Sequence, residues 1–217
     1  VRDLTLEFSG GVVRVDSCRV HVRRLPLLFG RLAPVSVDLG HAWAHVEKGH
    51  GIVPGWTGDT LPVRCDRLEV ELAEDSGPWL TWTIDDVDGR WGPESLEGRS
   101  HAGRLSGFGL SEQAVGWCLF FSSREQTRFL AFAPDESPTM LRSMDVRVAG
   151  KQITGQAQLS MDGGTSMEVL LRLGDDRNDR LSLQWAGTRL EMEGRLPRSG
   201  DPTMDLRVDV PESRLVD

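Results

Sequence analysis

The chain has 217 residues, of which 39% are hydrophobic and 27% charged, and its formal net charge is −8. A chain of this length suits one β-rich domain, and its hydrophobic content excludes an intrinsically disordered protein. The negative charge disfavours nucleic acid as a partner, because non-specific nucleic-acid binding depends on neutralising phosphates with Lys and Arg.

The first 84 residues alternate apolar and polar side chains with a period of two, which is typical of strands with one buried face. The apolar phase slips by one residue between Val15 and Cys18, which predicts a β-bulge around Asp16–Ser17. The side chains expected to point inward are Leu4, Leu6, Phe8, Val13, Val15, Cys18, Val20, Val22, Val35, Val37, Leu39, Leu68, Val70, Leu72, Leu80, Trp82 and Ile84.

Helix signals are confined to three short segments. Residues 23–32 predict one or two helical turns, with Pro26 tolerated near the start and Gly30 near the end. Residues 111–118 and 137–143 are further candidates, the second because Ser137–Pro138 resembles an N-cap followed by a first helical residue. The glycines of residues 85–143 favour bulges, sharp bends and irregular strands.

Alternation is clearest from residue 144 to residue 217. Short turns at Ala149–Lys151, Asp162–Gly164 and Ala186–Thr188 separate the strands, and glycine accepts the positive φ that hairpin turns require. The inward phase contains Met144, Val146, Val148, Val169, Leu171, Leu181, Leu183, Trp185, Leu190, Met192, Leu206 and Val208.

The whole pattern predicts an all-β protein, an antiparallel meander that forms a curved sheet, groove or sandwich with a few short helical turns. We expect one domain over residues 1–217. It has a possible subdivision into N-terminal hairpins (1–84), an irregular glycine-rich region (85–143) and hairpin repeats (144–217). Local alternation does not distinguish an open groove from a closed sandwich.

Candidate catalytic and metal-binding residues form no convincing motif. His41 and His45 are four residues apart, so on an extended strand about 13 Å separates them, too far to share one ion. Asp85, Asp86 and Asp88 favour an aspartate-rich turn over a calcium loop. Serine-nucleophile and phosphate-loop motifs are missing from the sequence. We therefore expect a non-enzymatic protein without metal or cofactor.

The cysteines and tryptophans each allow two interpretations. Cys18, Cys65 and Cys118 are far apart in the sequence, which favours small buried side chains over a metal or redox motif, although a disulfide between two of them stays open. Some tryptophans could stack on carbohydrate in a sandwich-type binding module. Core or groove lining is favoured, because Trp82 and Trp185 continue the apolar faces of strands.

The N-terminal part is locally basic within an acidic chain. Its arginines favour either a solvated face or proximity to an anionic lipid headgroup layer, where each basic residue contributes about 1 kcal/mol. These residues are Arg14, Arg19, Arg23, Arg24 and Arg31.

Residues Val1–Gly49 resemble the opening of AsmA-like proteins, a bacterial envelope family related to TamB and to repeating β-groove lipid transfer proteins. The resemblance rests on a strand pair, then the element "PLLFGRL" from Pro26 to Leu32, then a strand ending in "LG" at Gly40. The hairpins after Met144 are similar to the later repeats of that family. Some accessory proteins of type II secretion share the same pattern.

The resemblance implies a periplasmic protein whose curved sheet accommodates lipid acyl chains, or another hydrophobic ligand, on an apolar concave face. It also implies an inner-membrane anchor, which we expect outside these 217 residues, with Arg19, Arg23, Arg24 and Arg31 near the membrane. An envelope protein is a further possible partner, and a closed sandwich that binds carbohydrate or a secretion-system partner is the alternative. The residues expected to line the lipid groove are Val146, Val148, Val169, Leu171, Leu181, Leu183, Trp185, Leu206 and Val208.

Overall fold

In the computed structural model, the described part of the chain forms a single β-sheet of sixteen strands with one short helix, α1 (Arg24–Leu27). The predicted all-β class is confirmed. The structure describes residues 1–8, 11–47, 58–74, 77–107, 110–123, 125–133, 140–150, 152–160, 164–174, 179–195 and 203–209.

The strands fall into two groups by their place in the chain. The first group is β1 (Arg2–Phe8), β2 (Gly11–Val22), β3 (Pro34–Glu47), β4 (Leu61–Glu74), β5 (Gly77–Trp91), β6 (Ser95–Ser100), β7 (Ala102–Gly107) and β8 (Leu110–Val115). The second is β9 (Trp117–Ser123), β10 (Gln126–Phe132), β11 (Leu141–Ala149), β12 (Gln152–Ser160), β13 (Ser166–Leu173), β14 (Asp179–Trp185), β15 (Thr188–Arg195) and β16 (Thr203–Asp209).

Most neighbouring strands are antiparallel and consecutive in sequence, but the meander has two departures. Strands β3 and β4 pair in parallel, with Val37 opposite Val63 and Val46 opposite Leu72. The main order runs from β6 directly to β9, while β7 and β8 form a branch on β5. A purely antiparallel meander is therefore wrong at these two places. Parallel neighbours require the chain to return along the full strand, which local alternation does not predict.

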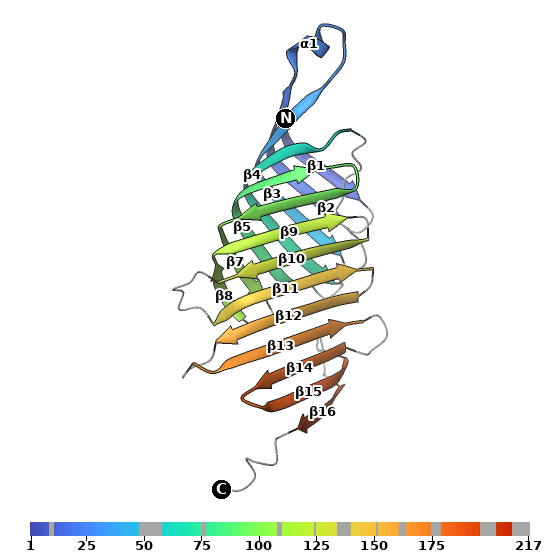
Figure 1. Cartoon of the computed structure of the whole chain (residues 1–217). Coiled ribbons are helices and arrows are strands. Elements are labelled where there is room, and N and C mark those ends of the chain that lie inside the picture. Colours follow the sequence, from blue (N-terminus) through green and yellow to red (C-terminus); the bar gives the residue numbers. More distant parts are fainter. Residues whose placement is uncertain are drawn as a thin grey trace.

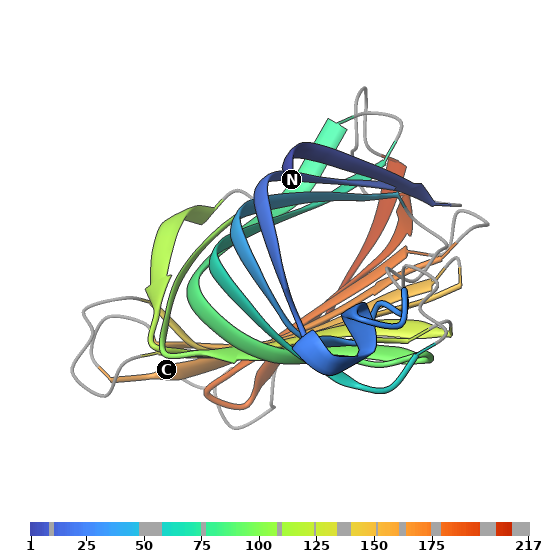
Figure 2. The same cartoon turned by 90° about the horizontal axis from the view of Figure 1, so that it is seen from above.

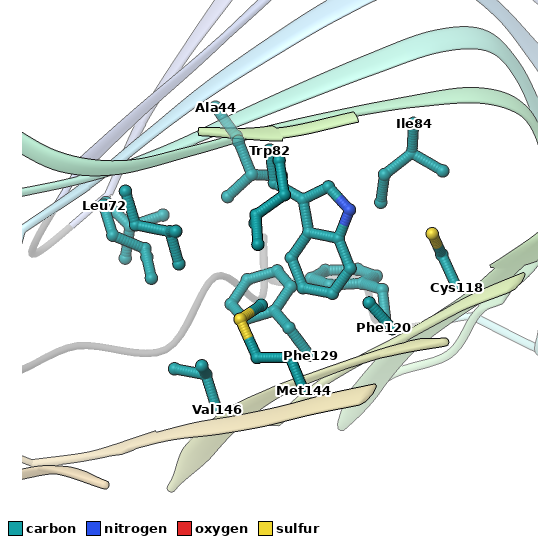
Figure 3. Close-up of a cluster of buried hydrophobic side chains, with 14 of the residues drawn as sticks. Ala44, Leu72, Trp82, Ile84, Cys118, Phe120, Phe129, Met144 and Val146 are labelled. Carbon is teal, nitrogen blue, oxygen red and sulfur yellow. The ribbon is translucent and has the colours of Figure 1, made fainter. Parts of the chain in front are cut away.

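The sheet curls so that its two halves face each other. Seen from above, strands β1–β5 arch over the later strands, and the inner faces enclose a common interior (Figure 2). The contact between the halves is direct, because the rings of Trp82 on β5 and Phe129 on β10 have centroids 5.1 Å apart. Phe120 on β9 extends this cluster, at 5.4 Å from Phe129. The middle of the molecule is thus a packed sandwich core (Figure 3).

The interior is almost wholly apolar, and the outer face is polar. Rows of inward side chains cross the strands in register; one row joins Leu6, Val13, Ala44, Val70 and Trp82. On the outside, ion pairs connect neighbouring strands, and Arg128 donates two hydrogen bonds of 2.9 and 2.7 Å to the carboxylate of Asp145. This hydrogen bonding lowers the pKa of Asp145.

The predicted phase slip near Asp16–Ser17 exists, but it is not a bulge with an extra residue. Val15 pairs with Ala42 and Cys18 with Leu39, so the register between β2 and β3 continues across the slip. Both flanking pairs line the same interior, because the apolar phase of β3 shifts at the same place as that of β2.

The slip continues onto β4 and β5. On β4, Cys65 and Leu68, three residues apart, line the same interior. On β5, Ile84 and Val87 both belong to the core, and Asp86 between them has a φ of 51°. The register is the same on both sides of the slip, so the slip interrupts pairing only locally while it bends four strands along one line, which we call the bend line.

Side chains replace the ladder hydrogen bonds that are lost at the bend line. The carboxylate of Asp16 accepts the backbone N–H of His41 at 2.8 Å, and its hydrogen bond with Ser17 contributes most to its lowered pKa. The Cys65 thiol donates to the carbonyl oxygen of Arg67 at 3.1 Å. The Ser100 hydroxyl donates to the carbonyl oxygen of Asp85, where β5 divides between β6 and β7. Buried backbone groups are costly when unpaired, so these contacts make the bend possible.

The helix predictions have mixed outcomes. Residues 23–32 contain the predicted helical turn as α1, and Gly30, which has a φ of 68°, lies in the turn that follows it. Residues 111–118 form strands β8 and β9 rather than a helix, and residues 141–143 open β11. Residues 137–139 lie outside the described part. The described part of residues 85–143 is more regular than predicted, because glycines such as Gly89 and Gly103 sit where neighbouring backbones approach closely and still allow pairing.

Candidate functional site: an apolar cavity beneath the first strands

A cavity of about 500 Å³ lies inside the arch of β1–β6, beside the packed core. Protein interiors contain few voids larger than a water molecule, whereas ligand pockets span about 300–1,000 Å³. A single charged residue, Glu97, is among the lining residues. The others are Leu4, Leu6, Val13, Val15, Cys18, Val20, Val22, Leu32, Pro34, Val37, Leu39, Ala42, Ala44, Leu61, Val63, Cys65, Leu68, Val70, Val87, Gly89, Trp91, Leu96, Gly98 and Phe120.

The cavity exists because small residues occupy inward positions where the sheet bends. Ala42 and Ala44 stand on β3 between larger neighbours such as Val15 and Val70. Removing side-chain volume along an arched sheet leaves a hollow rather than a packed layer.

One end of the cavity reaches the surface beside the β2–β3 hairpin. The lining there includes Val22 and Pro34, both half-buried, and Leu32, which is 78% exposed. The opposite end abuts the packed core at Phe120. An apolar molecule could therefore enter from the hairpin side without the core opening.

The chemistry of the lining suits hydrocarbon and offers little for catalysis. Burial raises the pKa of the Cys65 thiol to about 11, so this sulfur stays protonated at neutral pH. Cys18 also lines the cavity, two strands away, with Leu39 between them in register. All three cysteines, including Cys118, are unpaired.

The residues predicted to line a groove share one face of the later strands. One row joins Val146, Leu171, Leu181 and, at the level of backbone pairing, Leu206. A second row joins Met144, Val169, Leu183 and Val208, also by backbone pairing. The side chains of β16 lie outside the described part. We call these two rows the C-terminal apolar rows.

Burial of the residues predicted to line a groove decreases along the sheet. Val146 and Val148 are core residues at 2% and 3% exposure, so the structure places them in the sandwich rather than in an open groove. Leu181, Leu183 and Trp185 on β14 are only half-buried. Met167, Val169 and Leu171 on β13 still pack against the core, whereas the inner face of β14 is partly uncovered. In Figure 1, β14–β16 form the end of the sheet farthest from α1.

The predicted basic residues divide between two places. Arg23, Arg24 and Arg31 surround α1 at the tip of the β2–β3 hairpin and are exposed. Arg19 is exposed on β2, closer to the body of the sheet. Arg14 lies farther down β2, with its guanidinium carbon 5.3 Å from the centroid of the Trp43 ring.

The other candidate sites are not assembled. Nε2 of His41 lies 3.7 Å from Glu69, and Nδ1 of His45 lies 3.1 Å from Glu71, so each histidine faces its own carboxylate. Among the described residues, no group of three or more His, Cys, Asp or Glu side chains could hold a metal ion. The described helical part is also too short and polar to cross a membrane.

The tryptophans do not form one platform for sugar. Trp82 is in the core, Trp91 lines the cavity and Trp117 is exposed, with its ring 5.6 Å from that of Phe132. The side chain of Trp79 lies outside the described part.

Comparison with known proteins gives no match to a protein-family model, to a curated protein or to a solved structure. The cavity itself was not predicted as a site, although some of its residues, such as Leu4, Val13 and Leu39, were predicted to point inward. The alanines at positions 42 and 44 were the available signal.

Proposed function

We propose that this protein binds the acyl chain of a lipid, or a similar hydrophobic ligand, inside its arched sheet and acts without catalysis. The observation that carries the proposal is the cavity of about 500 Å³, because its lining is apolar and one end reaches the surface. Burial of a hydrocarbon chain there would contribute about 25 cal/mol for each Å² of apolar surface removed from water.

The C-terminal apolar rows support the same function at the other end of the sheet. Half-buried Leu181 and Leu183 continue the apolar interior beyond the packed core. The core around Trp82 and Phe129 separates the two regions, so we propose the cavity as the primary binding site. The resemblance of residues 1–49 to AsmA-like proteins favours a role in lipid transport or assembly in the bacterial envelope, at the periplasmic side of the inner membrane.

Native mass spectrometry of protein purified from cells, followed by lipid extraction, tests the proposal. We expect adducts with the mass of acyl lipids. A solvatochromic apolar probe, N-phenylnaphthylamine, should fluoresce on binding and be displaced by a fatty acid. Protein that carries no lipid and does not bind the probe would contradict the proposal and favour the closed-sandwich binding module.

A further inference from the structure

The β2–β3 hairpin projects beyond the sheet and ends in α1, far from the C-terminal strands (Figure 1). None of the residues of α1 is buried. Leu28 is 81% exposed and Phe29 is 76% exposed. We call the segment from Arg23 to Ala33 the hairpin tip; its exposed large apolar side chains are Leu25, Leu27, Leu28, Phe29 and Leu32.

Backbone hydrogen bonds give the hairpin tip a defined shape despite its exposure. Arg23 N–H donates to the carbonyl oxygen of Ala33 at 2.9 Å and closes the base. Phe29 and Arg31 N–H both donate to the carbonyl oxygen of Pro26, at 3.0 and 2.9 Å. A contiguous apolar group on an ordered, projecting element marks an interaction surface, because monomeric proteins rarely expose such patches without a partner.

The positive charge around the hairpin tip indicates an anionic partner. Arg19, Arg23, Arg24 and Arg31 lie between positions 19 and 37, a stretch with no acidic residue, whereas the whole chain has a net charge of −8. Apolar side chains surrounded by arginines suit the boundary between headgroups and acyl chains in an anionic bilayer. An apolar protein groove would leave these arginines without partners.

We propose that the hairpin tip inserts into the surface of an anionic lipid bilayer. Leu28 and Phe29 enter the acyl boundary, and the surrounding arginines contact the lipid phosphates. The tip is continuous with the cavity, because Leu32 belongs to the tip and also lines the cavity end that reaches the surface. Docking would place that end at the membrane. This inference goes beyond the proposed function, since the tip can bind a bilayer whether or not the cavity holds a ligand.

Flotation with vesicles tests the inference on the full chain. The tip variant combines Leu28→Ser with Arg31→Ser. The control combines Leu170→Ser with Arg172→Ser, which removes the same two residue types from the exposed outer face of β13. Both variants should keep the melting temperature of the wild type, because the substituted side chains are exposed. Both should also bind N-phenylnaphthylamine, so a loss of vesicle binding is separable from a loss of the cavity.

We expect the wild type and the control to float with vesicles of phosphatidylcholine containing about one third phosphatidylglycerol. The tip variant should lose at least about ten-fold in affinity, since one arginine near the surface accounts for about five-fold. Raising the salt from about 0.1 M to about 0.5 M should weaken wild-type binding.

Several results would overturn the inference. The inference fails if the wild type does not float with the anionic vesicles, or if the tip variant floats as well as the control. It also fails if the wild type binds vesicles of phosphatidylcholine alone as well as it binds the anionic vesicles. Concentration-dependent dimerisation that only the tip variant loses, without flotation of the wild type, would instead assign the tip to a second copy of the chain.

Discussion

The cavity can be tested by making one substitution, alanine to leucine, in two differently packed places. Ala42 lines the cavity on β3, and Ala131 lies in the packed core on β10 with 0% exposure. Three added carbons at position 42 can enter the hollow, where each buried methylene contributes about 0.8 kcal/mol at most. Cavity filling of this kind commonly stabilises a protein by about 0.5–2 kcal/mol. Ala131→Leu should instead destabilise by about 1–3 kcal/mol, because the core has no space to accept it.

Urea and thermal unfolding measure the two effects. For a chain of this size, 1 kcal/mol corresponds to about 2–4 °C in melting temperature. We expect Ala42→Leu to melt a few degrees above the wild type and to bind N-phenylnaphthylamine more weakly, because the added side chain occupies part of the ligand volume. Ala131→Leu should melt lower. If Ala42→Leu destabilises as much as Ala131→Leu, the cavity is not empty space, and unchanged probe binding would remove it as the ligand site.

Three further predictions concern the rows, the ion pair and the buried thiol. Val146→Asp should unfold the protein, at a cost above about 3 kcal/mol, whereas Leu183→Asp on the partly uncovered β14 should leave a cooperative melting transition in circular dichroism. Arg128→Ala should cost about 0.5–1 kcal/mol in urea unfolding at neutral pH. Because the pKa of Asp145 is lowered from 3.8 in the folded state, this contribution is present above pH 3.8 and should vanish as the pH falls through the folded pKa; a cost that persists in acid would exclude the ion pair as its source. Burial raises the pKa of Cys118 to about 11, so its thiol should resist iodoacetamide at neutral pH until denaturant is added, and rapid labelling of folded protein would contradict its burial.

The sequence alone was sufficient for the elements that depend on neighbouring residues. Period-two alternation predicted the strands, because a sheet with one buried face requires it. The turn at Ala186–Gly187 was also predictable. Both residues have positive φ values, 44° and 81°, and Trp185 pairs with Thr188 across a two-residue loop, as the twist of a hairpin favours. The inward phase of Val146, Leu171 and Leu181 followed from the same local rule.

Only the tertiary structure decided where the apolar face is closed, hollow or open. Local sequence patterns do not encode which strands pair. They therefore predict neither the parallel pairing of β3 with β4 nor the branch of the sheet at β5. The slip at Asp16–Ser17 was visible in the sequence as a change in the phase of the apolar–polar alternation. The matching slip at Asp86 on β5 could not be found, because a coordinated bend depends on which strands become neighbours. Alternation predicts that a side chain faces inward. Whether that side chain contacts Phe129, a cavity or solvent depends on how far the other half of the sheet extends over it.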